Sequence, residues 1–244
     1  MAPTHLGPTY EEMLHPHAID PALRAKARSK GGAGLFDIAW RDADGRAYVD
    51  VLPRELTGVD APIAVLYGRD MPTGSHKVGA AYAVLAEAVL SEGLEPGRHT
   101  CIWPSTGNYG IGGAWVAGQL GFDSIVVLPE SMSAERYALL RHYGSRIATT
   151  PGCESNVRQV YERCQQMVAS DPEHMRVLNQ FDAFGNYRFH YYVTGNTIAE
   201  AAAELGQRGV GRGRVAAYVS AMGSAGTIAA GDRLKQLWSD ALVV

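Results

Sequence analysis

Short apolar runs that favour β-strands alternate with longer stretches of helical spacing through most of this chain. Strand-like runs occur at 63–67, 99–103, 124–128, 146–149 and 214–220, and helical stretches at 78–90, 111–120, 134–143, 156–169, 197–205 and 226–238. Strands that alternate with helices predict a parallel sheet covered on both faces, which is the α/β class. The continuous apolar run at 63–67 predicts a buried strand. The first sixty residues are less regular, and we expect only a short helix within 11–29.

Composition narrows the class of protein. The 244 residues suffice for one large domain or two small ones, and the net charge of −3 gives no basic surface for nucleic acid. No apolar run approaches the ~20 residues that span a bilayer, and the N-terminus has no secretory pattern. The three cysteines are too sparse for a disulfide framework and have no zinc-site spacing, so we expect a cytoplasmic protein without a metal.

Lys77 is the first residue with distinctive chemistry. It follows a tight polar segment, Pro72–His76, and precedes small apolar residues at the start of an expected helix. A lysine there is usually a solvated charge. However, a helix N-terminus disfavours a cation, and packed surroundings lower the pKa of an amine from its free value of ~10.4. A lysine with these properties is a nucleophile and a base, which suggests Schiff-base chemistry.

Two Gly-rich turns lie where expected strands end, which is where α/β sheets bind ligands. The turn at 105–110 offers hydroxyls and amides that suit a carboxylate, and the amide of Asn108 suits a phenolic oxygen. The turn at 222–227 opens a helix with small and hydroxyl residues, which suits a phosphate. Each turn alone could be an ordinary connection, and neither matches a P-loop or a dinucleotide fingerprint.

Taken together and in order, these segments resemble the fold-type II pyridoxal-phosphate enzymes, the tryptophan synthase β and cysteine synthase superfamily. Pro72–Lys77 resembles the lysine motif, Ser105–Asn108 the asparagine loop and Gly223–Thr227 the phosphate loop. Gln180-Phe181 followed by Thr194-Gly195 resembles a cysteine synthase segment. The resemblance implies two three-layer αβα domains with mostly parallel sheets: a large cofactor-binding domain from 1–70 and 185–244, and a small substrate-loop domain from 71–184.

The resemblance also implies roles for single residues. Lys77 would bind pyridoxal 5'-phosphate covalently and move the proton at the substrate Cα, His76 would contact the phosphate, and Asn108 would contact the ring hydroxyl. The rest of the phosphate site would be Gly223, Ser224, Ala225, Gly226 and Thr227. The substrate carboxylate would be held by Ser105, Thr106, Gly107 and Gln180. Tyr109 stands where the family commonly has a smaller hydroxyl residue, and it could narrow the pocket or supply a phenol for acid–base work.

The implied activity is β-replacement on an amino acid with a leaving group at Cβ, such as O-acetylserine or O-phosphoserine, in a homodimer. Arg136, Arg141 and Arg188 are candidates to bind an anionic substrate group. Alternatives are β-elimination, as in dehydratases, a threonine synthase-like reaction, or a non-catalytic cofactor-binding subunit. The chain ends within an expected strand, before the family residue that contacts the pyridine nitrogen. We therefore expect the second domain to be incomplete and the chain to be part of a longer protein.

Overall fold

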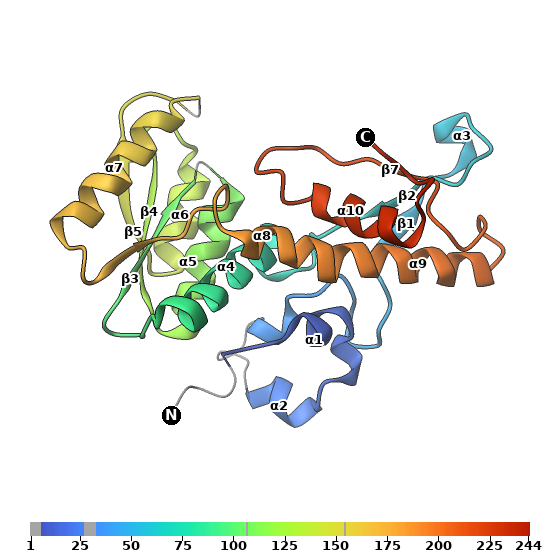
Figure 1. Cartoon of the computed structure of the whole chain (residues 1–244), viewed down its shortest axis with the longest axis horizontal. Coiled ribbons are helices and arrows are strands. Elements are labelled where there is room, and N and C mark those ends of the chain that lie inside the picture. The colour runs from blue at the N-terminus through green and yellow to red at the C-terminus, as the bar shows by residue number, and fades with distance from the viewer. Residues whose placement is uncertain (1–5, 27–32, 106, 154) are drawn as a thin grey trace. The chain divides into compact units, whose positions relative to one another are not determined.

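The computed structural model describes residues 6–26, 33–105, 107–153 and 155–244. The chain divides into two compact units, the first mainly Ser75–Asn186 and the second Gly7–Gly74 with Tyr187–Val244. Figure 1 shows the helices and strands of each unit.

The first unit is built on a four-stranded parallel sheet with the strand order β5-β4-β3-β6. Its strands are β3 (Thr100–Pro104), β4 (Asp123–Pro129), β5 (Arg146–Thr150) and β6 (Met175–Val177). The helices that connect them or precede them are α4 (Lys77–Glu92), α5 (Asn108–Leu120), α6 (Ala134–His142) and α7 (Val157–Ser170). This arrangement confirms the α/β class and the parallel sheet.

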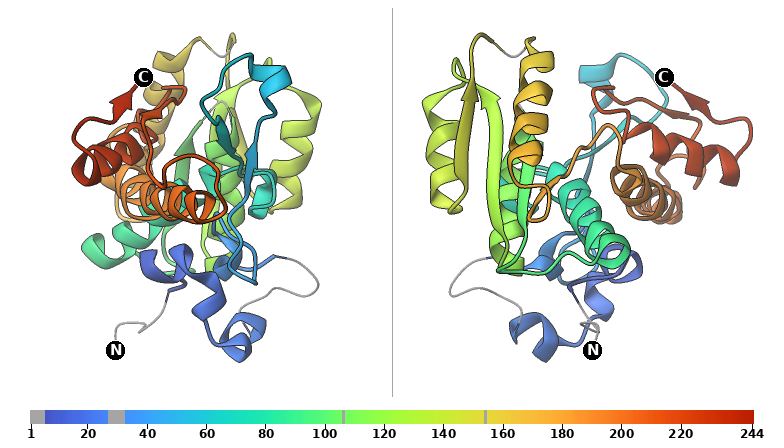
Figure 2. Two further views of the ribbon diagram at one scale, coloured as in Figure 1. Left: turned by 90° about the vertical axis from the view of Figure 1, so that its right-hand side faces the viewer. Right: turned by 60° about the vertical axis from the view of Figure 1, so that its left-hand side comes forward.

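The two faces of this sheet pack against different helices because side chains alternate along each strand. Ile102, Ile125 and Val127 form a buried cluster with Val160 and Cys164 of α7. Residues between them in the strands face α5, as the next section shows for Trp103 and Val126. Figure 2 shows α7, in gold, along one face of the strands.

The second unit is mainly helical. It contains α1 (Tyr10–Leu14), α2 (Pro21–Lys26), α3 (Arg54–Thr57), α9 (Asn196–Gln207) and α10 (Ile228–Leu237), with short 3-10 turns at 16–18, 35–37 and 72–74. A π-helical segment, His190–Gly195, joins α8 (Phe184–Phe189) to α9 without a break. Two two-stranded sheets complete the unit: β1 (Val49–Val51) with β2 (Ala64–Leu66), and β7 (Ala217–Tyr218) with β8 (Leu242–Val243).

The strand expected at 63–67 forms, but two features of it differ from the prediction. β2 pairs antiparallel with β1, and Ile63 and Val65 are each 41% exposed. An unbroken apolar run was taken as a sign of burial, but the run shows only composition and not what covers the strand. The run at 214–220 also shrinks to the two residues of β7, which pair in parallel with β8.

Candidate active site

Lys77 is the first residue of α4, and the segment before it has an unusual backbone. Thr73 has φ of 68° and Gly74 has φ of 70°, and the backbone N–H of Lys77 donates to Oγ of Ser75 at 3.3 Å. Among the described residues, Thr73 and Ala225 are the only non-glycine residues with positive φ. Both belong to the segments that the sequence singled out. Residues with a side chain rarely adopt a positive φ, and backbone strain of this kind is concentrated at functional sites.

Burial changes the proton affinity of Lys77 and of its neighbour. It lowers the pKa of the Lys77 amine from its ordinary value. Burial and the adjacent Lys77 charge lower the pKa of His76 from 6.5 to about 4. At neutral pH the His76 imidazole is therefore uncharged, and Lys77 gives up its proton more readily than an exposed lysine.

Asn108 begins α5, and the loop before it is shaped by Ser105. The buried Ser105 hydroxyl accepts hydrogen bonds from the backbone N–H of Gly107 at 3.2 Å and of Gly110 at 2.9 Å. Ser105 thus satisfies a backbone N–H in the first turn of α5, as capping serines do, and holds the turn in place. Thr106 lies outside the described residues.

Glycines bring α4 and α5 close together near Lys77. A Cβ atom at Gly112 would lie 2.9 Å from Cα of Val78 and 3.2 Å from the carbonyl oxygen of Lys77. Gly112 is one helical turn after Asn108, so this contact places the start of α4 beside the first turns of α5. Only a residue without a side chain permits so close an approach of two backbones.

The other face of α5 packs against the sheet in the same way. A Cβ at Gly113 would lie 2.2 Å from the Trp103 ring, and a Cβ at Gly110 would lie 2.8 Å from Cγ1 of Val126. Glycines inside a helix cost stability, so their presence at 110, 112 and 113 was a sequence signal of close packing.

Gln180 lies in the turn that follows β6, and this turn is also linked to α4. A Cβ at Gly185 would lie 2.7 Å from the backbone nitrogen of Val84 in α4. The Asn186 side chain donates to the carbonyl oxygen of Gln180 at 3.0 Å. The amide oxygen Oε1 of Gln180 is buried and has no hydrogen-bond partner among the described residues. The first unit therefore brings the segments of Lys77, Asn108 and Gln180 against one another.

Tyr109 was a candidate to supply a phenol for acid–base work, but its hydroxyl lies in the core. Its side chain is 1% exposed, and its hydroxyl donates to the carbonyl oxygen of Leu178 at 3.1 Å. Burial, with a smaller contribution from Cys101, holds the pKa of the phenol well above its usual range. The structure therefore does not support the acid–base role for this phenol, because the hydroxyl is committed to a backbone carbonyl inside the core.

Of the three arginines considered for an anionic substrate group, Arg136 lies near the asparagine loop. Its Nη2 is 4.0 Å from the position that a Cβ would take at Gly107. The guanidinium of Arg141 lies over the ring of Tyr137, 5.7 Å from its centroid, and Arg188 belongs to α8.

The loop at 223–227 belongs to the second unit and leads into α10. Among the described residues, the backbone N–H groups of Gly223, Ala225, Gly226 and Thr227 donate to no backbone carbonyl. A Cβ at Gly223 would meet nothing within 4 Å, so the loop is open at that point. Unengaged N–H groups at the start of a ten-residue helix favour an anion, and the residues present fit a phosphate.

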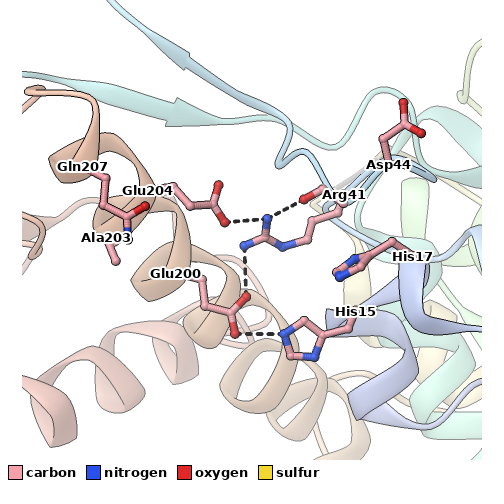
Figure 3. Close-up of a pocket in the computed structure, with 9 residues that line it drawn as sticks. His15, His17, Arg41, Asp44, Glu200, Ala203, Glu204 and Gln207 are labelled. Carbon is pink, nitrogen blue, oxygen red and sulfur yellow. Dashed lines mark hydrogen bonds and ion pairs between the residues drawn. The ribbon is translucent and has the colours of Figure 1, made fainter.

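A pocket lies elsewhere in the second unit. It has a volume of about 410 Å³ and is lined by polar and charged side chains of α9 and of the N-terminal segment, among them His15, His17, Arg41, Glu200 and Glu204 (Figure 3). None of the sequence-predicted site residues lines it. No group of three or more His, Cys, Asp or Glu side chains in the described part of the chain could hold a metal ion. In the same part, no helix is long and apolar enough to cross a membrane.

Several known proteins are similar to this chain. A probable cysteine synthase of Bacillus subtilis is 35% identical over 176 residues, which are 70% of this chain and 53% of that protein. Cysteine synthase A of Salmonella typhi is 32% identical over 135 residues, 55% of this chain and 38% of that protein. The chain thus spans about half the length, or less, of these curated relatives.

Solved structures share the fold. The O-acetylserine dependent cystathionine beta-synthase from Helicobacter pylori superposes with a TM-score of 0.70 at 22% identity, over 80% of this chain and 61% of that one. The sequence model of the family described as "Pyridoxal-phosphate dependent enzyme" matches residues 57–240, which contain every site residue predicted above. The chain belongs to the family of pyridoxal-phosphate dependent enzymes.

Proposed function

We propose that this protein catalyses β-replacement on an amino acid that carries a leaving group at Cβ, as the cysteine synthases do. The observation that carries the proposal is Lys77: a half-buried amine of lowered pKa, at the start of a helix packed closely against α5, whose first residue is Asn108. The curated relatives named cysteine synthase, at 32–35% identity, support this reaction class over the alternatives. A sulfur nucleophile is the expected second substrate.

The residues present fit the cofactor, and each has a proposed task. Lys77 would hold pyridoxal 5'-phosphate covalently, and its amine would take and return the proton at the substrate Cα. The backbone N–H groups of Gly223, Ala225, Gly226 and Thr227 would bind the phosphate. When bound, the cofactor supplies the electron sink for the carbanion at Cα. Asn108 orients the ring through its amide.

Two further groups complete the proposed site, one beside Lys77 and one for the substrate carboxylate. The neutral His76 adds no positive charge beside Lys77, so it does not compete with the amine for a proton. The proposed carboxylate site combines the Ser105–Gly107 loop with Gln180, whose amide Nε2–H is the atom that can donate to a carboxylate. A homodimer and a cytoplasmic location remain predictions.

The intact protein tests the proposal through its visible spectrum. We expect a yellow protein whose visible absorbance is bleached by borohydride, and a Lys77→Ala variant without that absorbance. Lys235→Ala, on α10, is the matched control, because its ammonium donates to the Ala241 carbonyl outside the predicted motifs. A colourless protein that ignores added pyridoxal 5'-phosphate would contradict the proposal.

The reaction class needs a second measurement. O-Acetylserine, O-phosphoserine and serine are supplied with and without sulfide, and the amino-acid product is identified. Replacement predicts a sulfur amino acid that appears only with sulfide. Pyruvate and ammonia formed equally with and without sulfide would favour elimination instead.

A further inference from the structure

Tyr109 links two segments of the proposed site through a single hydrogen bond. It follows Asn108 directly, and its hydroxyl donates to the carbonyl oxygen of Leu178, two residues before Gln180. Its ring meets the buried Trp103 edge-on, with centroids 5.6 Å apart. Since Trp103 is itself packed on Gly113, the tyrosine has little room to move.

The turn that Tyr109 reaches is held by other contacts except at the glutamine amide. Asn179 accepts hydrogen bonds from the backbone N–H of Phe181 at 3.2 Å and from the Tyr161 hydroxyl at 3.3 Å. Leu178 continues the sheet, because its N–H donates to the carbonyl oxygen of Ile102 at 2.8 Å. Within the described residues, the polar atom of this turn left buried without a hydrogen-bond partner is Oε1 of Gln180. A well-held turn with one buried, unpartnered amide oxygen leaves the Gln180 amide free to bind a ligand: its oxygen can accept a hydrogen bond, and its Nε2–H can donate one to a carboxylate.

We propose that Tyr109 is a positioning residue for the amino-acid substrate. Through the Leu178 carbonyl, its hydroxyl holds Gln180 at a set distance from Ser105 and Asn108, and this spacing determines how well the Nε2–H of Gln180 reaches the substrate carboxylate. The inference rests on the proposed function, because it needs these two segments to hold one carboxylate. If Tyr109 were only a core residue, loss of its hydroxyl would lower stability and would weaken substrate binding no more than cofactor binding.

Tyr109→Phe is the test, because it keeps the ring and removes only the hydroxyl. We expect it to retain its visible absorbance and its affinity for pyridoxal 5'-phosphate, but to bind O-acetylserine about tenfold more weakly in spectral titrations. Tyr137→Phe is the matched control: Tyr137 also donates to backbone carbonyls at the end of a strand, those of Pro129 and Glu130. It should bind the amino acid like the wild type.

A double-mutant cycle identifies the residue through which Tyr109 acts. In a Gln180→Ala background the effect of Tyr109→Phe on amino-acid affinity should largely disappear, because no amide remains to be positioned. Equal effects in both backgrounds would overturn the inference. Hydrogen exchange of the cofactor-free protein adds a readout that needs no activity: Tyr109→Phe should speed exchange at residues 178–183, and unchanged exchange there would also overturn the inference.

The outcomes separate this inference from the proposed function. Absence of a visible band in the wild type contradicts the proposed function, and the inference with it. A band that none of the amino acids perturbs contradicts the substrate role of Gln180. A band perturbed at the same concentration in the wild type, Tyr109→Phe and Tyr137→Phe contradicts the positioning role alone.

Discussion

At the scale of single residues, the chain places two basic side chains next to each other in a half-buried position. Desolvation disfavours the charged form of each, and the Lys77 charge further disfavours protonation of His76. Such pairs are costly to keep in a fold, so their presence in a motif with a left-handed Thr73 is most simply explained by chemistry at this point.

The buried imidazole makes a prediction about pH. The pKa of His76 is about 4 in the folded protein and 6.5 in its ordinary state, so the unfolded chain binds the extra proton first as pH falls. Folding stability should therefore be complete above pH 6.5 and should decline between pH 6.5 and 4, by about 2 kcal/mol at pH 4.5.

Denaturant unfolding at pH 7 and pH 4.5 measures this contribution. His76→Asn should lose about 2 kcal/mol less than the wild type between the two pH values, because it lacks the group that titrates. His142→Asn removes an exposed histidine and serves as the control, which should follow the wild type. Identical pH dependence in His76→Asn and the wild type would show that His76 is not desolvated as described.

At the scale of elements, the position of helix α5 depends on glycines, whose lack of a side chain allows close packing. Gly112 admits the backbone of α4, and Gly113 admits the Trp103 ring from the sheet. The same helix carries Asn108 at its start, so its packing sets where the amide lies relative to Lys77. Loss of a close backbone contact should therefore affect both stability and cofactor binding.

Gly112→Ala tests the contact between α4 and α5. The new methyl group would press on Cα of Val78 and the carbonyl oxygen of Lys77, and backbone atoms cannot rotate away. We expect a loss of about 2–3 kcal/mol in the free energy of unfolding, with weaker retention of pyridoxal 5'-phosphate. Gly118→Ala in the same helix is the control, because its nearest atom, the Tyr143 carbonyl oxygen, would be at an ordinary 3.5 Å. A Gly112→Ala protein as stable as Gly118→Ala would refute this account of the packing.

Periodicity and local motifs were enough to predict most elements of the first unit and the positions of the site segments. The runs at 99–103 and 124–128 lie within one or two residues of β3 and β4. β6 was missed because Met175–Val177 is short and contains a central arginine, and the π-helical segment has no distinctive pattern. The buried hydrogen bond of Tyr109 could not be predicted, because its partner Leu178 is remote in sequence and offers only a backbone carbonyl.

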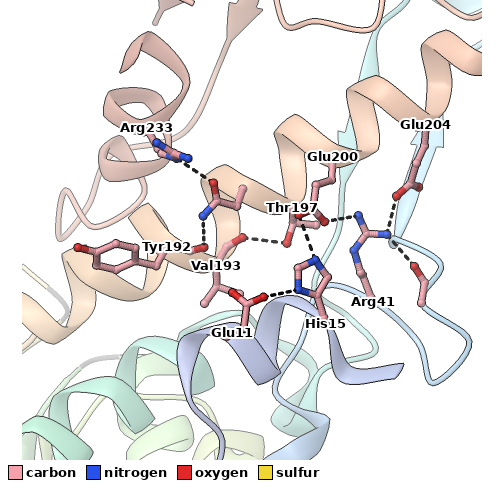
Figure 4. A network of polar contacts seen from close by, with 11 residues as sticks. Glu11, His15, Arg41, Tyr192, Val193, Thr197, Glu200, Glu204 and Arg233 are labelled. Atoms are coloured by element: carbon pink, nitrogen blue, oxygen red, sulfur yellow. Dashed lines mark hydrogen bonds and ion pairs between the residues drawn. The ribbon is translucent and has the colours of Figure 1, made fainter. Parts of the chain in front are cut away.

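At the scale of the whole molecule, the two units are stabilised by different interactions. The first has a parallel sheet with apolar clusters, whereas the second ties its N-terminal segment to α9 through charged groups (Figure 4). The side chain of Arg41 is 3% exposed and forms ion pairs with Glu200 at 2.9 Å and Glu204 at 2.8 Å. His15 contacts both Glu200, at 3.1 Å, and Glu11, at 2.9 Å. These contacts within the second unit make no use of the first.

This difference predicts that an interior charge change should loosen one unit and spare the other. Arg41→Met keeps the length of the side chain but leaves the two partly buried glutamates without their cation, which should cost about 2–3 kcal/mol. Hydrogen exchange should become faster in α1 and α9, while β3 and β4 keep their protection. Arg46→Ala, an exposed arginine of the same loop, should leave both patterns unchanged. Equal acceleration in β3, β4 and α9 would instead mean that the two units open as one cooperative body.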